Sequence, residues 1–295
     1  MAQAEATVLK AGCKVNLWLR ITGARPDGYH DLDTLFYPLP EPHDTIHVSE
    51  GLAGSGVTLT CDIPELAGQD NLLVKAARAF QRESGVGADL ALHLEKRIPV
   101  GAGLGGGSSD AASLLRFLNK EAGDQILSQD DLNSLAASLG ADVPFFLQDK
   151  PARALSIGEQ LTPLQDQAET LLQGLSLVLV CPDLHVSTAW AYSAWDKAQE
   201  KILSPRGESL TALLQAGISS VSRCPALLVN DFEPVVFAAY PELRRLKERL
   251  LQSGASSALL SGSGASMFAL FRDKATAQDA AKGVADTATT YMMML

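Results

Sequence analysis

The stretch Pro99-Val-Gly-Ala-Gly-Leu-Gly-Gly-Gly-Ser-Ser-Asp110 is the most informative part of this chain. It carries five glycines between Gly101 and Gly107. Glycine has no Cβ, adopts positive φ, and lets consecutive N–H groups converge on one anion. A helical pattern follows directly, so the N–H groups at the start of that helix point toward the same place. The stretch therefore predicts a loop that binds phosphate groups, with two serine hydroxyls available to a phosphate oxygen or to the shell of a Mg²⁺ ion.

Two other interpretations of this loop remain open, and a third is excluded. A flexible linker would not be expected between a well-defined strand and a well-defined helix. A dinucleotide-binding turn would need the pattern G-x-G-x-x-G, which Gly103 and Gly105 fit only loosely, and no acidic residue stands out about twenty residues on. A Walker loop is excluded because the sequence Gly-Lys-Ser/Thr does not occur here.

The segments on both sides of the loop show regular hydrophobic periods. Leu90–Leu94 alternates as a strand that runs through to Pro99, and Ser109–Leu118 has helical spacing. A serine or an aspartate at the end of the loop is expected to cap that helix. Upstream, Asn71–Phe80 predicts another helix, with leucine, alanine and phenylalanine side chains on one stripe.

Near the N-terminus, Val15–Ile21 alternates between apolar and polar residues, which predicts a half-buried strand. Because side chains two positions apart in a strand share a face, Lys14 and Asn16 are expected to lie on the same face.

The second half of the chain predicts a mixed layer of helices and strands. Leu175–Val180 is rich in residues that favour strands, and Leu243–Leu250 is an amphipathic helix that ends before Gly254. A strand at Ala258–Leu260 and a strand at Ser266–Phe271 follow, joined by a glycine turn. Helix, strand, turn and strand in this order favour an α+β fold over a βαβ repeat.

Composition limits the class of protein. The chain has 295 residues, of which 46% are hydrophobic and 20% charged, which is typical of one large or two smaller globular domains. The net charge of −10 argues against nucleic acid as a partner. No run is apolar and long enough to cross a membrane, and Met1–Thr7 has no signal-peptide pattern. The four cysteines (Cys13, Cys61, Cys181 and Cys224) form no zinc pattern, which predicts reduced thiols in a cytoplasmic protein.

The segment Pro99–Ala112 resembles the second motif of the GHMP kinases, a superfamily of small-molecule kinases. Its triple-glycine form is similar to one branch, whose members phosphorylate 4-diphosphocytidyl-2-C-methyl-D-erythritol. Further segments resemble the same branch, and they occur in the expected order along nearly the whole chain: Lys14–Leu17, Arg25–His30, Gly140–Phe146, Leu260–Ser266 and, more weakly, Asn230–Pro234. The sequence Gly12-Cys13 departs from the Pro-Ala that usually precedes the lysine in this branch.

The resemblance implies a two-domain α+β fold with the site between the domains. Residues 1–160 are expected to form an ATP-binding N-terminal domain like domain 2 of ribosomal protein S5, and residues 161–295 a ferredoxin-like C-terminal domain. The implied reaction is ATP-dependent phosphorylation of the substrate's 2-hydroxyl in the non-mevalonate route to isoprenoids. Mg²⁺ is expected with ATP, its protein ligands are unknown, and a monomer or a weak homodimer is expected.

Asp142 is the candidate general base. From the residue pattern alone, a carboxylate between Gly140 and Pro144 is either a turn cap or a catalytic group. The resemblance implies catalysis, with Lys14 as the partner that stabilises charge on the attacking oxygen or the transferred phosphate.

The resemblance also implies three groups of binding residues. The residues expected to bind ATP are Asn71, Leu72, Lys96, Pro99, Gly101, Gly103, Gly105, Gly106, Gly107, Ser108 and Ser109. The residues expected to bind the substrate are Asn16, Tyr29, His30, Thr188 and Tyr192. The residues of the third family motif, which a simple hairpin turn would also resemble, are Gly262, Ser263 and Gly264.

Tyr29 and His30 follow a Pro-Asp-Gly turn, and the resemblance implies that they recognise a cytosine ring. A second aromatic residue, either Tyr192 or Trp190, is expected to face them from the other domain, so that the base is sandwiched. Another GHMP kinase, acting on homoserine, mevalonate or a sugar, would need no such platform, and a GHMP-fold sensor would bind ligand without turnover.

Overall fold

The computed structural model describes residues 6–87, 89–164, 172–199, 210 and 228–295. Two compact units divide the chain. Unit 1 contains Pro38–Val100, Gly105–Asp149 and the N-terminal stretch up to Lys14. Unit 2 contains Val15–Tyr37, Gly101–Leu104 and the stretch from Lys150 onward. The proposed division into residues 1–160 and 161–295 stays a prediction.

Two long strands, β1 (Thr7–Ala24) and β2 (His30–Glu50), are neighbours in one sheet and contribute residues to both units. The prediction that β1 is half-buried is wrong for its middle part. Lys14, Asn16 and Trp18 are 5%, 2% and 3% exposed, as deeply buried as the apolar residues between them. Alternation therefore identified the strand but not the burial of both its faces.

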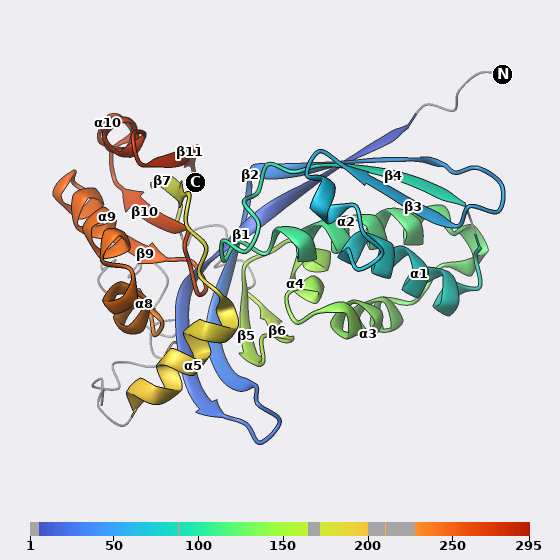
Figure 1. The fold of residues 1–295 in the computed structure, drawn as a ribbon, viewed down its shortest axis with the longest axis horizontal. Helices are drawn as coiled ribbons and strands as arrows, with labels where there is room; N and C mark the ends of the chain where they lie inside the picture. Colours follow the sequence, from blue (N-terminus) through green and yellow to red (C-terminus); the bar gives the residue numbers. More distant parts are fainter. Residues whose placement is uncertain (1–5, 88, 165–171, 200–209, 211–227) are drawn as a thin grey trace. The chain divides into compact units, whose positions relative to one another are not determined.

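In unit 1, β2 pairs antiparallel with β4, and β4 pairs parallel with β3. The further elements of this unit are β3 (Val57–Cys61), η1 (Pro64–Leu66), α1 (Leu72–Ser84), β4 (Leu90–Glu95), α2 (Gly106–Glu121), η2 (Gly123–Gln125), α3 (Gln129–Leu139) and α4 (Val143–Gln148). Helix α1 packs on α2, and α2 packs on α4 (Figure 1).

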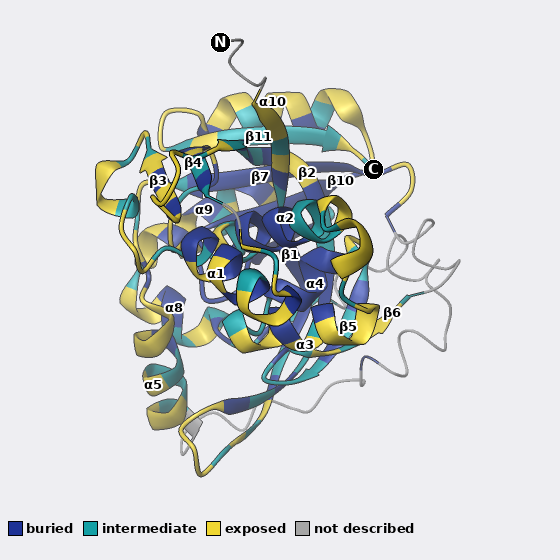
Figure 2. Ribbon diagram, turned by 90° about the vertical axis from the view of Figure 1, so that its right-hand side faces the viewer, coloured by how far each residue is buried: buried dark blue, intermediate teal, exposed yellow. Residues whose placement is uncertain are grey.

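The core of unit 1 lies between the sheet and these helices. Ile46 and Leu92 from the sheet pack with Leu73 and Leu114 from α1 and α2, and all four are at most 3% exposed. Helix α1 carries one buried stripe and one exposed stripe, as its amphipathic pattern predicted (Figure 2).

Helix α2 differs from its prediction at the N-terminus. It begins at Gly106, three residues before the predicted Ser109, and its N-cap is Gly105 with no side-chain cap hydrogen bond. The prediction of a serine or aspartate cap is therefore wrong. Ser109 and Asp110 lie inside the first turns and are buried.

Unit 2 contains a four-stranded antiparallel sheet in the order β11-β7-β10-β9. The elements after residue 150 are β5 (Ala152–Ser156), β6 (Gln160–Pro163), β7 (Ser176–Pro182), α5 (Thr188–Gln199), β8 (Val229–Asn230), α8 (Glu233–Ala239), α9 (Pro241–Gln252), β9 (Ser257–Leu260), β10 (Met267–Phe271), α10 (Lys274–Val284) and β11 (Ala288–Met294). Within this sheet the strand order is 4-1-3-2, and helices lie in the chain between its first and second strands and between its third and fourth, as in the predicted ferredoxin-like domain.

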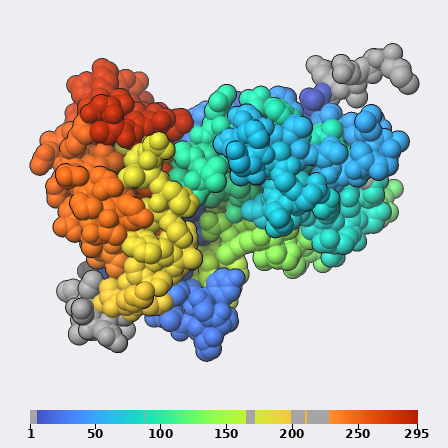
Figure 3. Space-filling model, viewed as in Figure 1, coloured from blue at the N-terminus to red at the C-terminus, as the bar shows by residue number. Residues whose placement is uncertain are grey.

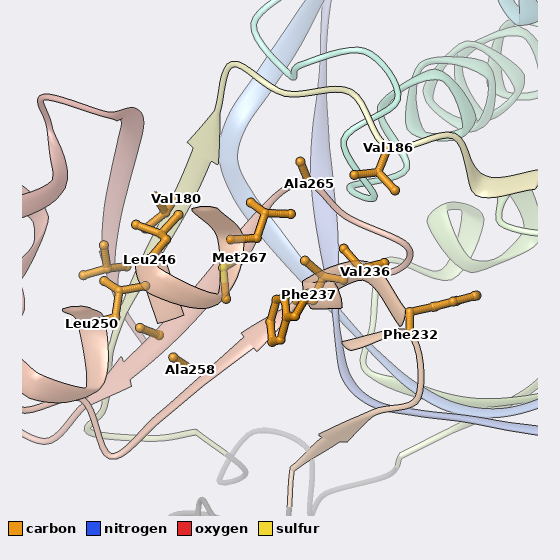
Figure 4. Packing of buried hydrophobic residues seen from close by; sticks show 14 of the residues in the cluster. Val180, Val186, Phe232, Val236, Phe237, Leu246, Leu250, Ala258, Ala265 and Met267 are labelled. Atoms are coloured by element: carbon orange, nitrogen blue, oxygen red, sulfur yellow. The ribbon is translucent and has the colours of Figure 1, made fainter. Parts of the chain in front are cut away.

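The core of unit 2 is built from one face of this sheet and the helices that cover it (Figure 4). Leu246 and Leu250 of α9 pack with Val180, Ala258 and Met267 of the strands. The methionines at positions 292–294 belong to β11, which pairs with β7 along its whole length.

No helix among the described residues is long and apolar enough to cross a membrane. Cys13 and Cys181 are buried and Cys61 is partly buried, and none of these three forms a disulfide within the described part of the chain. Cys224 and most of the segment Met1–Thr7 lie outside the described residues.

Candidate active site

In unit 1, the two candidate catalytic residues face each other. Lys14 Nζ lies 3.8 Å from Asp142 Oδ2, and the two side chains are 6% and 32% exposed. Burial lowers the pKa of Lys14, and the charge of Asp142 opposes that shift. Asp142 stands at the N-cap of α4 but makes no side-chain cap hydrogen bond. The carboxylate is thus directed to the lysine and to solvent rather than to the helix it precedes.

The glycine-rich loop ends against this pair. Gly105 has φ of +73°, and a Cβ there would lie 2.8 Å from the Phe146 ring and 3.4 Å from Lys14 Cε. Arg116 of α2 donates a hydrogen bond to the carbonyl oxygen of Phe146 in α4. Glycine is therefore required where the loop, the lysine and the helix after Asp142 approach one another.

The same need for glycine explains the departure at Gly12. A Cβ at Gly12 would lie 2.5 Å from the carbonyl oxygen of Leu39 in β2. The backbones of β1 and β2 approach each other closely at Gly12, two residues before Lys14. A larger residue at this position would therefore require the two strands to move apart.

The N-terminus of α2 is open to an anion. The first backbone hydrogen bond into the loop is from Ser109 N to the carbonyl oxygen of Gly105, at 2.9 Å. No side chain caps the preceding N–H groups of Gly106, Gly107 and Ser108. Free N–H groups at the positive end of a 16-residue helix suit a phosphate group.

Lys96 lies beneath this helix terminus and is held by two aspartates. Its Nζ is 2.5 Å from Asp44 Oδ2 and 3.1 Å from Asp110 Oδ2, and all three side chains are at most 6% exposed. Asp44 also accepts hydrogen bonds from the backbone N–H groups of Arg97 and Ile98. This cluster, which we call the Lys96 cluster, ties β2, the end of β4 and the start of α2 together.

The pKa values of Asp110 and Lys96 in the Lys96 cluster are shifted from their ordinary values. Burial raises the pKa of Asp110 to about 7, while Lys96 opposes the rise and Asp44 adds to it. Burial lowers the pKa of Lys96, but Asp110 and Asp44 outweigh it and hold that pKa above its ordinary value. Asp110 Oδ1 is buried without a hydrogen-bond partner. Sequence reasoning missed Asp44 and Asp110, because neither belongs to a pattern that signals an ion pair.

Two other predicted ATP residues lie at the start of α1. Asn71 caps this helix: its side chain accepts a hydrogen bond from Leu73 N and donates one to the carbonyl oxygen of Leu66. Leu72 is half-buried, and its Cδ1 lies 3.7 Å from where a Cβ of Gly107 would be. The structure thus brings Leu72 next to the first turn of α2.

In unit 2, the first part of the glycine loop packs on the third-motif loop. Gly103 has φ of +78°, and a Cβ there would collide with the carbonyl oxygen of Ser261. Ser261 Oγ in turn donates to the carbonyl oxygen of Gly103, at 2.9 Å. Asn230 donates to the carbonyl oxygens of Leu260 and Gly262, both at 2.8 Å, and so fixes the third-motif loop.

Two predicted substrate residues lie beside the same loop. Thr188 Oγ1 is 2.8 Å from Ser263 Oγ. Asn16 donates to Thr34 Oγ1, also at 2.8 Å, and its Oδ1 is 3.7 Å from where a Cβ of Gly262 would be. Polar groups from β1, α5 and the third motif therefore converge within unit 2.

The predicted base-binding residues are only partly arranged as expected. His30 stacks directly on Tyr192, with ring centroids 4.5 Å apart and an interplanar angle of 19°. No third ring fits between them at that spacing, and both residues belong to unit 2 rather than to different domains. The predicted sandwich between these two rings is therefore wrong. Tyr29 is 59% exposed, and Trp190 packs on Tyr240 instead.

No group of three or more His, Cys, Asp or Glu side chains that could hold a metal occurs within the described part of the chain. Among the residues at the glycine loop, the oxygen-bearing side chains are the hydroxyls of the half-buried Ser108 and the buried Ser109. A hydroxyl and phosphate oxygens are ligands that Mg²⁺ accepts, so these residues fit an ion that is held mainly by a nucleotide and water.

A buried lysine facing a carboxylate, next to a glycine loop that opens into an uncapped helix, is suited to phosphoryl transfer. The family models described as GHMP kinases N terminal domain and GHMP kinases C terminal match residues 71–150 and 210–288. The chain belongs to the GHMP kinases, and it has their two-domain fold, as the sequence predicted. It is an ATP-dependent kinase.

The relatives narrow the family further. The 4-diphosphocytidyl-2-C-methyl-D-erythritol kinase of Solidesulfovibrio magneticus is 49% identical, over 92% of this chain and 91% of that protein. A crystal structure of a 4-(cytidine 5'-diphospho)-2C-methyl-D-erythritol kinase matches with a TM-score of 0.75 and 33% identity, covering 97% of this chain and 98% of the other. The chain is thus a member of the 4-diphosphocytidyl-2-C-methyl-D-erythritol kinase branch.

A homoserine kinase from Cytophaga hutchinsonii has nearly the same fold, with a TM-score of 0.72 over 100% of this chain and 96% of the other. Its sequence is only 18% identical. The fold is therefore shared by kinases named for different substrates, and the substrate must be argued from the site and from the relatives.

Proposed function

We propose that this enzyme transfers the γ-phosphate of ATP to the 2-hydroxyl of 4-diphosphocytidyl-2-C-methyl-D-erythritol, a step of isoprenoid biosynthesis. The observation that carries the proposal is the Lys14–Asp142 pair, 3.8 Å apart, beside Gly105 of the glycine loop. The names of the relatives supply the substrate.

In this proposal Asp142 accepts the proton of the substrate hydroxyl. Its side chain is 32% exposed, so a substrate oxygen can approach it, and no cap hydrogen bond occupies its lone pairs. Lys14 is nearly buried and can neutralise negative charge that develops on the attacking oxygen or on the transferred group. Because Lys14 is buried, little water surrounds its ammonium group. Its charge is therefore only weakly screened and interacts more strongly with a nearby negative charge.

The glycine loop and the first turn of α2 would hold the ATP phosphates. Gly101, Gly103 and Gly105 all have positive φ, a conformation in which a glycine can present its backbone N–H group to an anion. The uncapped N-terminus of α2 adds further donors. Mg²⁺ belongs to this proposal as an ion that accompanies ATP and screens the phosphate charge.

Recognition of the cytidine group would fall to Tyr29, His30 and Tyr192. The exposed Tyr29 ring offers a flat surface on which a base can stack, and His30 with Tyr192 forms a second, ordered aromatic surface. Thr188 and Asn16 would bind the sugar-derived part of the substrate. A cytoplasmic location and a monomeric or weakly dimeric state stay predictions.

The test is a coupled assay of ATP conversion to ADP by the purified chain with each candidate substrate in turn. The cytidine diphosphate substrate should give turnover, whereas homoserine, mevalonate and a simple sugar should not. Turnover with one of those three instead would assign another GHMP kinase. Binding of the cytidine substrate without any ADP formation would favour a sensor.

A further inference from the structure

Asp196 of α5 forms a hydrogen bond with His30, the first residue of β2, within unit 2. His30 Nε2 lies 2.8 Å from Asp196 Oδ1. The histidine is 7% exposed, whereas the aspartate side chain is 47% exposed. Helix α5 lies at the surface of its unit (Figure 3), and the Asp196 side chain on it is partly exposed to solvent.

This contact defines which ring nitrogen carries the hydrogen. An ionised carboxylate only accepts hydrogen bonds, so the nitrogen that faces it must be the N–H donor. In the neutral imidazole the other nitrogen, Nδ1, then holds a lone pair and acts as an acceptor. Asp196 therefore selects the tautomer of His30 with the hydrogen on Nε2.

The Nδ1 atom of His30 is available to a ligand. No hydrogen bond to it occurs among the described residues, and it is not one of their fully buried polar atoms without a partner. The ring itself cannot turn freely, because it stacks on Tyr192 at 4.5 Å and meets the edge of Trp195 at 5.7 Å. A fixed ring presents an acceptor in one direction.

We propose that Asp196 is a positioning residue for base recognition, because it holds His30 in the tautomer whose Nδ1 accepts a hydrogen bond from an amino group on the substrate base. The inference rests on the proposed function and names the basis of its selectivity. Cytosine carries an N4 amino donor at the position where uracil carries the O4 acceptor. An acceptor at Nδ1 pairs with the first and opposes the second.

The first arm of the test needs no substrate. Nitrogen chemical shifts of the His30 imidazole, measured by NMR in the wild-type protein, should report the hydrogen on Nε2. In Asp196→Ala the same signals should report a mixture of both tautomers. A wild-type ring with its hydrogen on Nδ1 would overturn the proposal.

The second arm measures the ratio of kcat/KM for the cytidine substrate to that for its uridine analogue. Asp196→Ala should reduce this ratio by about tenfold, the worth of about one hydrogen bond, mainly through KM, while kcat for the cytidine substrate stays within about twofold. Asp196→Asn should reduce it less, because an amide oxygen can still accept from Nε2. An unchanged ratio in Asp196→Ala would overturn the proposal.

Asp279→Asn is the matched control. Asp279 is an exposed aspartate on α10 whose ion-pair partner among the described residues is Lys282 of the same helix, so its substitution should leave both the ratio and the melting temperature unchanged. If the wild type fails to phosphorylate the cytidine substrate at all, the proposed function fails, and the selectivity role fails with it. The NMR arm separates that case from loss of the tautomer lock alone.

Discussion

The Nζ atom of Lys14 lies 3.8 Å from Oδ2 of Asp142, and this carboxylate makes no hydrogen bond to the helix that it precedes. A residue at an N-cap normally stabilises its helix through its side chain. Here the side chain faces a buried cation instead, which is the arrangement expected of a catalytic base with its charge partner.

Asp142→Asn should therefore lower kcat by about 10²–10⁴-fold, because the amide keeps the size of the side chain but cannot accept the hydroxyl proton. Nucleotide binding, measured by calorimetry, should change little. Asp149→Asn is the control, since Asp149 ends the same helix in a left-handed conformation that asparagine also tolerates. Retention of more than about a tenth of wild-type kcat in Asp142→Asn would identify the residue as structural.

Two glycines of the loop should respond oppositely to the same substitution. Gly103→Ala should destabilise the protein by more than about 2 kcal/mol, because φ is +78° and the new Cβ collides with Ser261. Gly107→Ala should leave stability unchanged or raise it by about 0.5–1 kcal/mol, because the nearest atom is 3.7 Å away and alanine favours helix. Urea unfolding of both variants checks this. Equal destabilisation by the two would contradict the described loop geometry.

The Lys96 cluster predicts a pH dependence of stability. Burial raises the pKa of Asp110 from 3.8 to about 7, so between these values the folded state keeps a proton that the unfolded state has lost. The free energy of unfolding that this group contributes therefore falls as pH rises through that window, and levels off above it.

Asp110→Asn removes this titration and can still accept a hydrogen bond from Lys96. The stability of the variant relative to wild type should thus increase from about pH 4 to about pH 7. The measurement is urea unfolding of both proteins across this range. A relative stability that is flat or that decreases with pH would show that Asp110 is ionised in the folded protein throughout.

Substitution of the aromatic residues of unit 2 should change KM for the cytidine substrate more than it changes kcat. Tyr192→Ala should raise KM for the cytidine substrate by about tenfold, because it removes the ring that supports His30, while kcat changes little. Trp190→Ala should change KM by less than about threefold, because that ring packs on Tyr240. A larger effect from Trp190 would assign the stacking role to it.

Local patterns in the sequence predicted part of the fold, and the long strand β2 was not among the predicted elements. Strands at Leu90–Glu95, Ser257–Leu260 and Met267–Phe271 and the helix at Pro241–Gln252 lie within a few residues of their predictions. The start of α2 could not be predicted from capping rules, because this helix begins after Gly105 without a side-chain cap hydrogen bond. The burial of Lys14 could not be predicted from alternation, which reports one face of a strand at a time.

The candidate site was predicted in part from local residue patterns and in part from the family resemblance. The glycine loop could be predicted from its composition, whereas the pairing of Lys14 with Asp142, far apart in the sequence, was implied by the resemblance. The contact of Lys96 with Asp44 joins residues 52 positions apart, and that of His30 with Asp196 joins residues 166 apart. No periodic pattern reports such contacts, so neither aspartate was singled out.

The enzyme is expected to require the cytidine diphosphate group of its substrate. The most direct measurement compares kcat/KM for 4-diphosphocytidyl-2-C-methyl-D-erythritol with kcat/KM for methylerythritol phosphate without the cytidine group, at saturating ATP. We expect efficient turnover of the first substrate and a loss of at least about 10³-fold in kcat/KM for the second, since base stacking and hydrogen bonding would both be absent. Comparable efficiency with the two substrates would contradict this requirement.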